Sequence, residues 1–238
     1  MSKGKIIIYT GPMFSGKTTR LVSDLERAYI AKMAGVDIDY AGFKPLLDRR
    51  YSDFEFRDGL YIGRMDTHSG NNIKCYGVER FEDIYRIVIE LEEKNKNIKR
   101  VGIDELNLFP DDWKIIRDVA EELAYGRGKE ITIACLDMDF RGEPFKPAPE
   151  IFSVADEVYK CKAVCMICGE DANRSQRLEL KDLKDGKPIY VPSPYDGELI
   201  VVGAGLPKEA KQFPQHIYEA RCAKHHEVPG KRRYFESK

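Results

Sequence analysis

The stretch Gly11-Pro12-Met13-Phe14-Ser15-Gly16-Lys17-Thr18 decides how this chain folds. It follows an apolar run, 5–10, and precedes a segment with helical periodicity, 18–34. The spacing G-x-x-x-x-G-K-[ST] between a strand and a helix is that of a phosphate-binding loop. Backbone N–H groups of such a loop surround phosphate oxygens, and the helix N-terminus adds favourable potential for negative charge. The sequence therefore predicts a nucleotide-binding site, with Lys17 on the phosphates and the Thr18 hydroxyl on Mg2+.

Strands and amphipathic helices alternate along the first part of the chain. Strand–helix alternation on this scale predicts an α/β fold with a mostly parallel sheet flanked by helices. After about residue 160, short strands, glycines and prolines replace helices, and metal-ligating residues appear. We expect strands over 36–43, 100–105, 131–136 and within 153–163, and helices over 81–94 and 112–125. We expect a P-loop nucleotide-binding domain over 1–158, a small zinc-binding β domain over 159–228 and a C-terminal tail over 229–238.

The composition is that of a soluble globular protein without a strong electrostatic preference. Formal net charge is −1, hydrophobic residues make up 42% and charged residues 33% of the 238 residues, which is ordinary for this class. The near-zero charge and the lack of a basic stripe argue against nucleic acid as a partner. No apolar run approaches the ~20 residues that a membrane span needs. We therefore expect a cytoplasmic protein with neither nucleic acid nor membrane as partner.

Two acids, Asp104 and Glu105, end a buried strand. In enzymes with a phosphate loop, an acid at a strand end holds Mg2+, and a carboxylate beside it can accept a proton from a nucleophile. Because adjacent side chains of a strand point to opposite faces, the two acids can divide these roles. Two solvated acids at a strand end are the other interpretation, which the phosphate loop disfavours.

Two short metal-binding patterns stand far apart in the second half of the chain. Cys165-Met-Ile-Cys168 and Cys222-Ala-Lys-His225 together offer the four S and N ligands that tetrahedral Zn2+ takes. Cys161 and His226 are rival ligands a few residues away, and free thiols or a redox C-x-x-C are alternatives. In a reducing compartment the six cysteines are not a disulfide framework. We predict a structural Zn2+ site.

A basic pair follows the second expected strand, in Asp48-Arg49-Arg50-Tyr51. An arginine there could offset the charge on a phosphoryl group in transfer. Taken alone, the pattern of these residues favours ordinary surface charges.

Several motifs, in order over residues 5–228, resemble those of the type II thymidine kinases. The phosphate loop has the unusual Pro12-Met13-Phe14 of that family. The other matching segments are Phe43-Lys-Pro45 with Asp48–Ser52, Gly102–Glu105 with Phe109-Pro110, Leu136–Phe145, Ala163–Cys168, Arg177-Leu178 and Tyr218–Cys222.

This resemblance implies transfer of the γ-phosphoryl group of ATP to the 5′-OH of thymidine and of deoxyuridine. Glu105 would be the base, Asp104 and Thr18 would position Mg2+, and Lys17 and Arg50 would stabilise charge on the γ-phosphoryl group. Asp48 would join the loop residues 11–18 in binding ATP, and a lasso within 159–228 would cover the substrate. The nucleoside would contact Met13, Leu108, Leu136, Phe140, Phe145, Ser175 and Tyr218. The resemblance also implies a homotetramer that is inhibited by dTTP.

The chain departs from the family pattern at several positions. Asn107 and Leu108 stand where Gln and Phe are usual, Ser175 replaces a threonine, and His225 replaces the last zinc cysteine. Residues 206–216 resemble an insertion in the lasso. A P-loop ATPase whose zinc module binds DNA or a protein partner is a second hypothesis. A kinase for another deoxynucleoside, suggested by Leu108 and by the insertion, is a third.

Overall fold

The computed structural model describes residues 4–48, 54–67, 70–201 and 213–232. The chain forms two compact units. The first comprises the described residues of Met1–Thr10, Gly16–Asp137 and Phe145–Cys161; the second comprises those of Gly11–Ser15, Met138–Pro144 and Lys162–Lys238. The chain thus passes from one unit to the other inside the phosphate loop and again around the segment 138–144.

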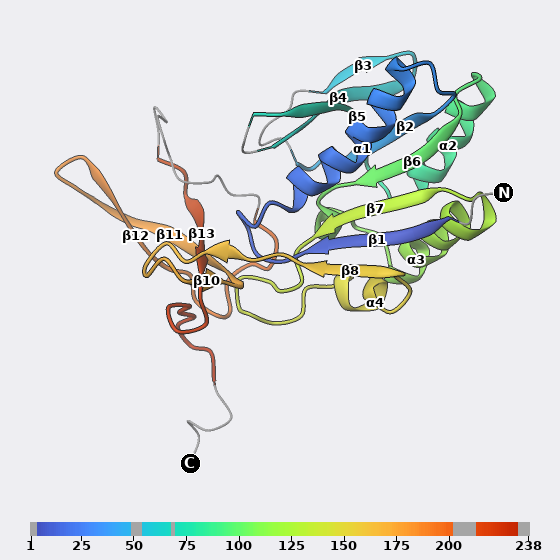
Figure 1. Ribbon diagram of the computed structural model, residues 1–238. Coiled ribbons are helices and arrows are strands. Elements are labelled where there is room, and N and C mark those ends of the chain that lie inside the picture. Colours follow the sequence, from blue (N-terminus) through green and yellow to red (C-terminus); the bar gives the residue numbers. More distant parts are fainter. Residues whose placement is uncertain (1–3, 49–53, 68–69, 202–212, 233–238) are drawn as a thin grey trace. The chain divides into compact units, whose positions relative to one another are not determined.

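The first unit is built on an eight-stranded sheet in the order β3-β4-β5-β2-β6-β7-β1-β8 (Figure 1). From β5 to β8 in this order all neighbouring strands are parallel, whereas β3, β4 and β5 pair antiparallel. The predicted mostly parallel sheet is confirmed. The strands are β1 Lys5–Thr10, β2 Asp39–Pro45, β3 Glu55–Arg57, β4 Leu60–Asp66, β5 Asn72–Val78, β6 Ile98–Ile103, β7 Glu130–Cys135 and β8 Glu157–Lys160.

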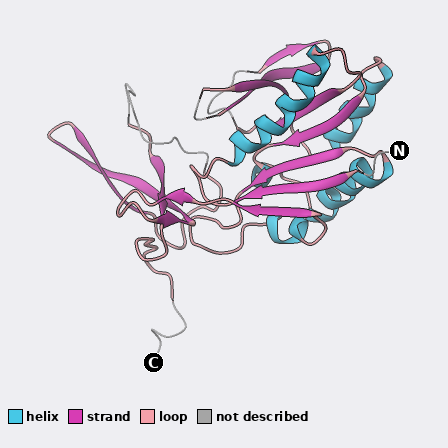
Figure 2. Ribbon diagram, in the orientation of Figure 1, coloured by secondary structure: helices cyan, strands magenta, loops and turns pink. Residues whose placement is uncertain are grey.

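Helices cover both faces of this sheet (Figures 1 and 2). Side chains of β1 alternate between the two faces of the sheet, as those of a strand do. Ile7 packs with residues of α1, whereas Ile6 and Ile8 lie in the core that α2, α3 and α4 share. Among the described residues, no helix combines the length and apolar character needed to cross a bilayer. The helices are α1 Lys17–Met33, α2 Glu82–Glu93, α3 Trp113–Glu121 and α4 Ala148–Phe152, with a 3-10 turn η1, Leu106–Leu108, and a π-helical turn η2, Glu122–Gly126.

Three elements differ from the sequence prediction by more than one residue. The expected helix 112–125 ends as an α-helix at Glu121 and continues as the wider turn η2. The expected strand 100–105 ends at Ile103, so the two acids follow the strand instead of belonging to it. The expected strand 36–43 begins only at Asp39, after a turn closed by the N–H of Val36 on the Ala31 carbonyl.

The second unit consists of strands and loops, without an α-helix among its described residues (Figure 2). β9 Ala163–Val164 and β10 Asp171–Ala172 form one antiparallel pair. β11 Arg174–Lys184, β12 Lys187–Pro192 and β13 His216–Arg221 form a sheet in the order β12-β11-β13. Its apolar core is small, and small cores commonly need a metal or another cross-link.

Candidate functional site

The phosphate loop has the conformation that its glycines predict. Gly11, Phe14 and Gly16 have φ values of 138°, 64° and 78°, and such values favour glycine because they crowd a Cβ. Gly16 is also the N-cap residue of α1. The first turn of α1 carries no acidic side chain, so the positive end of the helix dipole is available to an anion.

Three parallel strands bring the charged residues of the first unit to one edge of the sheet. Lys17 opens α1 after β1, Lys44 lies at the end of β2, and Asp104 follows β6. Carboxyl ends of parallel strands meet at the same edge, where α/β proteins bind ligands. The Thr18 hydroxyl lies 3.2 Å from each carboxylate oxygen of Asp104, so the two residues predicted to hold Mg2+ are in contact.

Burial and neighbouring charges shift the pKa values of the Asp104 carboxyl group and of the Lys17 ammonium group. Asp104 is 5% exposed, and burial, together with the neighbouring Glu105 carboxylate, raises its pKa to about 6 although Lys44 opposes the shift. Burial lowers the pKa of Lys17, an effect that Glu105 and Asp104 oppose. Strongly perturbed groups gathered in this way are typical of active sites.

A buried ion pair supports this edge of the sheet. The Lys44 ammonium lies 2.8 Å from the Asp48 carboxylate, and both side chains are almost completely buried. Although burial opposes it, the Asp48 charge raises the pKa of Lys44. Asp48, predicted to bind ATP, therefore pairs with a lysine that the sequence prediction missed; its signal was a charged residue inside the apolar run before Pro45. Arg50, the predicted catalytic arginine, lies outside the described residues.

Glu105 owes its orientation to a turn of the backbone. It has φ 53° and ψ 45°, a left-handed conformation that is uncommon for a residue with a side chain and that often marks a functional site. Its carbonyl accepts a hydrogen bond from the N–H of Leu108 at 2.9 Å. The sequence analysis expected the alternation of side chains along a strand to separate the two acids. This reason is wrong, because β6 ends at Ile103, before either acid.

Asn107 ties the segment after Glu105 to two residues predicted to contact the nucleoside. Its side chain is buried. The N–H of Leu136 donates to Asn107 Oδ1 at 2.7 Å, and Asn107 Nδ2 lies 3.0 Å from the Leu136 carbonyl and 3.3 Å from the Phe145 carbonyl. Leu136, Phe145 and the half-buried Leu108 all belong to the first unit.

The other predicted nucleoside contacts lie in the second unit. Met13 donates its N–H to Ser175 Oγ at 3.0 Å, and the Tyr218 hydroxyl donates to the Val201 carbonyl at 2.8 Å. Phe140 and Ser175 are buried. The structure therefore places three of the seven predicted contacts in the first unit and four, Met13, Phe140, Ser175 and Tyr218, in the second.

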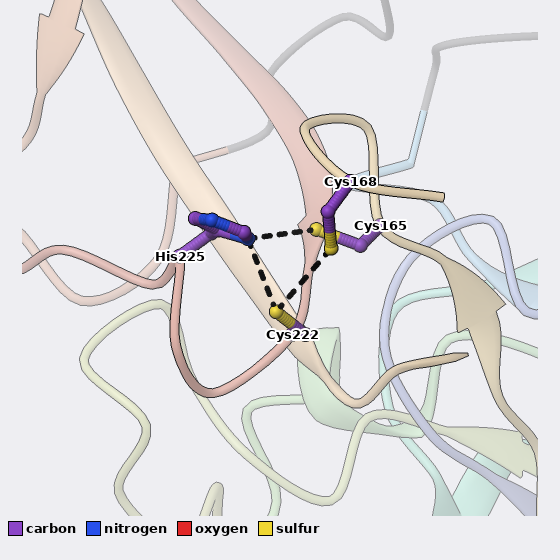
Figure 3. Close-up of side chains that lie close together, drawn as sticks. All are labelled: Cys165, Cys168, Cys222 and His225. Carbon is purple, nitrogen blue, oxygen red and sulfur yellow. Dashed lines mark hydrogen bonds between the residues drawn. The ribbon is translucent and has the colours of Figure 1, made fainter. Parts of the chain in front are cut away.

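Four predicted zinc ligands converge in the second unit (Figure 3). Cys165 Sγ lies 3.7 Å and Cys222 Sγ 3.3 Å from His225 Nδ1, and the sulfurs of Cys168 and Cys222 are 3.9 Å apart. Zinc bonds of 2.0–2.3 Å in tetrahedral geometry separate neighbouring ligand atoms by about 3.5–3.8 Å. These donor atoms therefore suit Zn2+.

Backbone groups favour the thiolate that such an ion needs. Burial opposes ionisation of Cys165, but backbone N–H groups, led by that of Cys222, and the His225 ring lower its pKa to about 5. Metal binding requires deprotonated thiols. The surroundings of Cys165 thus favour the ionised form of the thiol that a metal ion needs.

The two rival ligands have other partners. Cys161 packs in the core of the first unit, and its thiol lies 3.7 Å from the Tyr159 carbonyl. His226 Nε2 lies 2.9 Å from the Phe140 carbonyl, so this nitrogen carries the proton. Burial lowers the pKa of His226. Of the two adjacent histidines, His225 alone joins the cluster of donors found among the described residues.

Comparison with known protein families agrees with this geometry. Residues 4–226 of the 238 match the thymidine kinase family. The match includes the phosphate loop, the acids after β6 and all four residues of the Cys/His cluster. The chain therefore belongs to the thymidine kinase family and has the motifs of its type II members.

Proposed function

We propose that this protein transfers the γ-phosphoryl group of ATP to the 5′-OH of thymidine and of deoxyuridine, with Glu105 as the base. The contact of Thr18 with both oxygens of Asp104 carries the proposal, since it joins the phosphate loop to the strand-end acid. Glu105 follows directly, in a strained conformation.

Each residue has a defined task in the proposed reaction. The loop 11–18 and Lys17 bind and orient the phosphates, and Arg50 offsets charge on the group in transfer. Glu105 accepts the proton of the 5′-OH as the oxygen attacks phosphorus, and the bond to the ADP oxygen breaks. Positioning and charge stabilisation dominate phosphoryl transfer because little covalent chemistry is left to the protein.

Thr18 and Asp104 supply the hard oxygen donors that Mg2+ prefers. When bound, Mg2+ would neutralise charge on the phosphate oxygens. Asp104 would hold the metal side and Glu105 the nucleoside side of the transferred group.

The test is ADP and nucleoside monophosphate formation from ATP–Mg2+, compared for thymidine, deoxyuridine, deoxycytidine, deoxyguanosine and no nucleoside. We expect turnover with the first two only, and a loss of about 10²–10⁴-fold in Glu105→Gln, the range for a general base. Glu93→Gln, an exposed acid at the end of α2, is the matched control.

Other outcomes would replace the proposal. Turnover on a different nucleoside would mean that the substrate specificity differs from the family's, and would assign this difference to Leu108 or to the lasso. Hydrolysis indifferent to nucleoside and stimulated by DNA would support an ATPase. Homotetramer formation and inhibition by dTTP, which the family resemblance supports, are tested by light scattering and by adding dTTP to the same assay.

A further inference from the structure

Arg177, in the middle of β11, is a buried cation without a carboxylate partner among the residues that the structure describes. It is 1% exposed, and its Nε has no hydrogen-bond partner in the described part of the chain. Burying a charge without an opposite charge is unfavourable. Arg177 therefore needs another contact that offsets the free-energy cost of removing its charge from water.

The guanidinium makes that contact with an aromatic ring. Its central carbon lies 3.5 Å from the centroid of the Phe140 ring, well inside the range of a cation–π interaction. Both residues belong to the second unit. Because the ring is buried against a planar cation, its orientation depends on where Arg177 is held.

Arg177 also holds the segment 193–201, which we call the 193–201 loop. Its own carbonyl accepts the N–H of Ser193 at 3.1 Å, and its Nη1 donates to the Glu198 carbonyl. A Cβ at Gly197 would lie 2.6 Å from Arg177 Nη2, so the loop passes as close to the guanidinium as glycine permits.

Tyr218 lies directly opposite Arg177 in the β11–β13 pairing. Cross-strand partners share one face of a sheet, and the Tyr218 hydroxyl donates to the Val201 carbonyl at 2.8 Å. Two neighbouring side chains thus hold the 193–201 loop at Glu198 and at Val201.

We propose that Arg177 is a positioning residue for the nucleoside: it fixes the Phe140 ring and the 193–201 loop in the arrangement that binds the base. This inference rests on the proposed function, in which Phe140 contacts thymidine. A residue with this role changes nucleoside affinity while leaving ATP binding and the fold intact.

The first experiment measures KM for thymidine, KM for ATP, kcat, zinc content and Tm in Arg177→Met and Arg177→Lys. We expect Arg177→Met to raise the thymidine KM at least about tenfold, the loss of a desolvated cation–π contact, with the ATP KM unchanged. Its Tm stays equal or rises, because an apolar side chain replaces a buried charge. Arg177→Lys keeps the charge but not the planar stacking, so its thymidine KM lies between those of the unaltered protein and Arg177→Met. Lys181→Met, which removes an exposed cation from the same strand, is the control.

A second experiment introduces Gly197→Ala into the unaltered protein and into the Arg177→Met variant. Alone, the added methyl group displaces the guanidinium and raises the thymidine KM. In Arg177→Met it has little further effect, and this non-additivity identifies contact between the two residues.

Two results would overturn the inference: a fall in Tm with an unchanged thymidine KM, which marks a purely structural residue, or additive effects in the double variant. Failure of the proposed function is distinguishable, because the unaltered protein would then form no thymidine monophosphate in the same assay.

Discussion

The Thr18 hydroxyl and the Asp104 carboxylate form one oxygen-lined position, with 3.2 Å from Thr18 Oγ1 to either carboxylate oxygen. Neighbouring oxygen ligands of octahedral Mg2+ at 2.0–2.1 Å are about 2.9 Å apart. The start of α1 and the end of β6 are therefore spaced so that a small shift would let both groups bind the same cation.

Removal of the Thr18 hydroxyl should weaken Mg2+ binding. We expect Thr18→Ala to shift the Mg2+ dependence of activity to higher concentrations, while Thr18→Ser, which keeps the hydroxyl, stays near the unaltered protein. The measurement is initial rate against free Mg2+ at saturating ATP. An unchanged Mg2+ midpoint in Thr18→Ala would show that Thr18 does not ligate the metal.

The Asp104 carboxylate should destabilise the fold at neutral pH. Burial raises the pKa of this carboxyl group to about 6 in the folded chain, well above its ordinary value. The folded state therefore binds the proton more tightly, and stability falls as the pH rises from the ordinary value to about 6. The shift corresponds to about 3 kcal/mol. We expect Asp104→Asn to be inactive yet more stable than the unaltered protein at pH 8, with the advantage shrinking toward pH 4.

Urea unfolding at pH 4, 6 and 8, without added metal, tests this expectation. Glu93→Gln removes an exposed carboxylate and should show no such trend. An Asp104→Asn protein that is less stable at pH 8 would contradict the electrostatic account.

The adjacent histidines should differ in their effect on zinc. We expect His225→Ala to lower the zinc content per chain, because His225 Nδ1 lies among the sulfurs. His226→Ala should retain zinc, because its ring contacts the Phe140 carbonyl instead. Metal analysis after dialysis against a weak chelator separates the two. Zinc loss in His226→Ala alone would reverse the assignment.

Loss of the Asn107 amide should destabilise the first unit. Asn107→Leu leaves the Leu136 N–H and two carbonyl groups without their side-chain partner, and a buried unsatisfied group costs about 1–3 kcal/mol. We expect a decrease of at least about 2 kcal/mol in the free energy of unfolding. Asn107→Gln restores both donor and acceptor and should lose less.

Equilibrium urea unfolding measures both variants, with Asn72→Leu, at an exposed position of β5, as the control. Equal stability of Asn107→Leu and the control would mean that these hydrogen bonds contribute little.

The parallel sheet and the phosphate loop could be predicted because local patterns determine them. Glycines at fixed spacing between an apolar run and an amphipathic helix admit few structures. The Cys/His cluster was predictable for a similar reason, since the spacings C-x2-C and C-x2-H offer the S and N donors that suit tetrahedral Zn2+.

What the sequence left open depends on long-range geometry. His225 and His226 have equal chemistry and adjacent positions, so only the packing of His226 on the Phe140 carbonyl separates them. The antiparallel strands β3 and β4 were not predicted, because β3 is short and its side chains are exposed. Arg177 gave no local sign of burial, since its contacts with Phe140 and Glu198 join residues remote in sequence.

The spacing of the Cys/His cluster has a consequence for chain entropy. Cys168 and Cys222 are separated by 54 positions, and β11, β12 and the 193–201 loop all lie between them. A metal bridging these sulfurs closes a large ring, which removes conformational freedom from the unfolded chain; for a covalent cross-link of this span the effect is about 4 kcal/mol. Zinc depletion should therefore lengthen the search by which β11 finds β13, and slow refolding of the second unit more than that of the first.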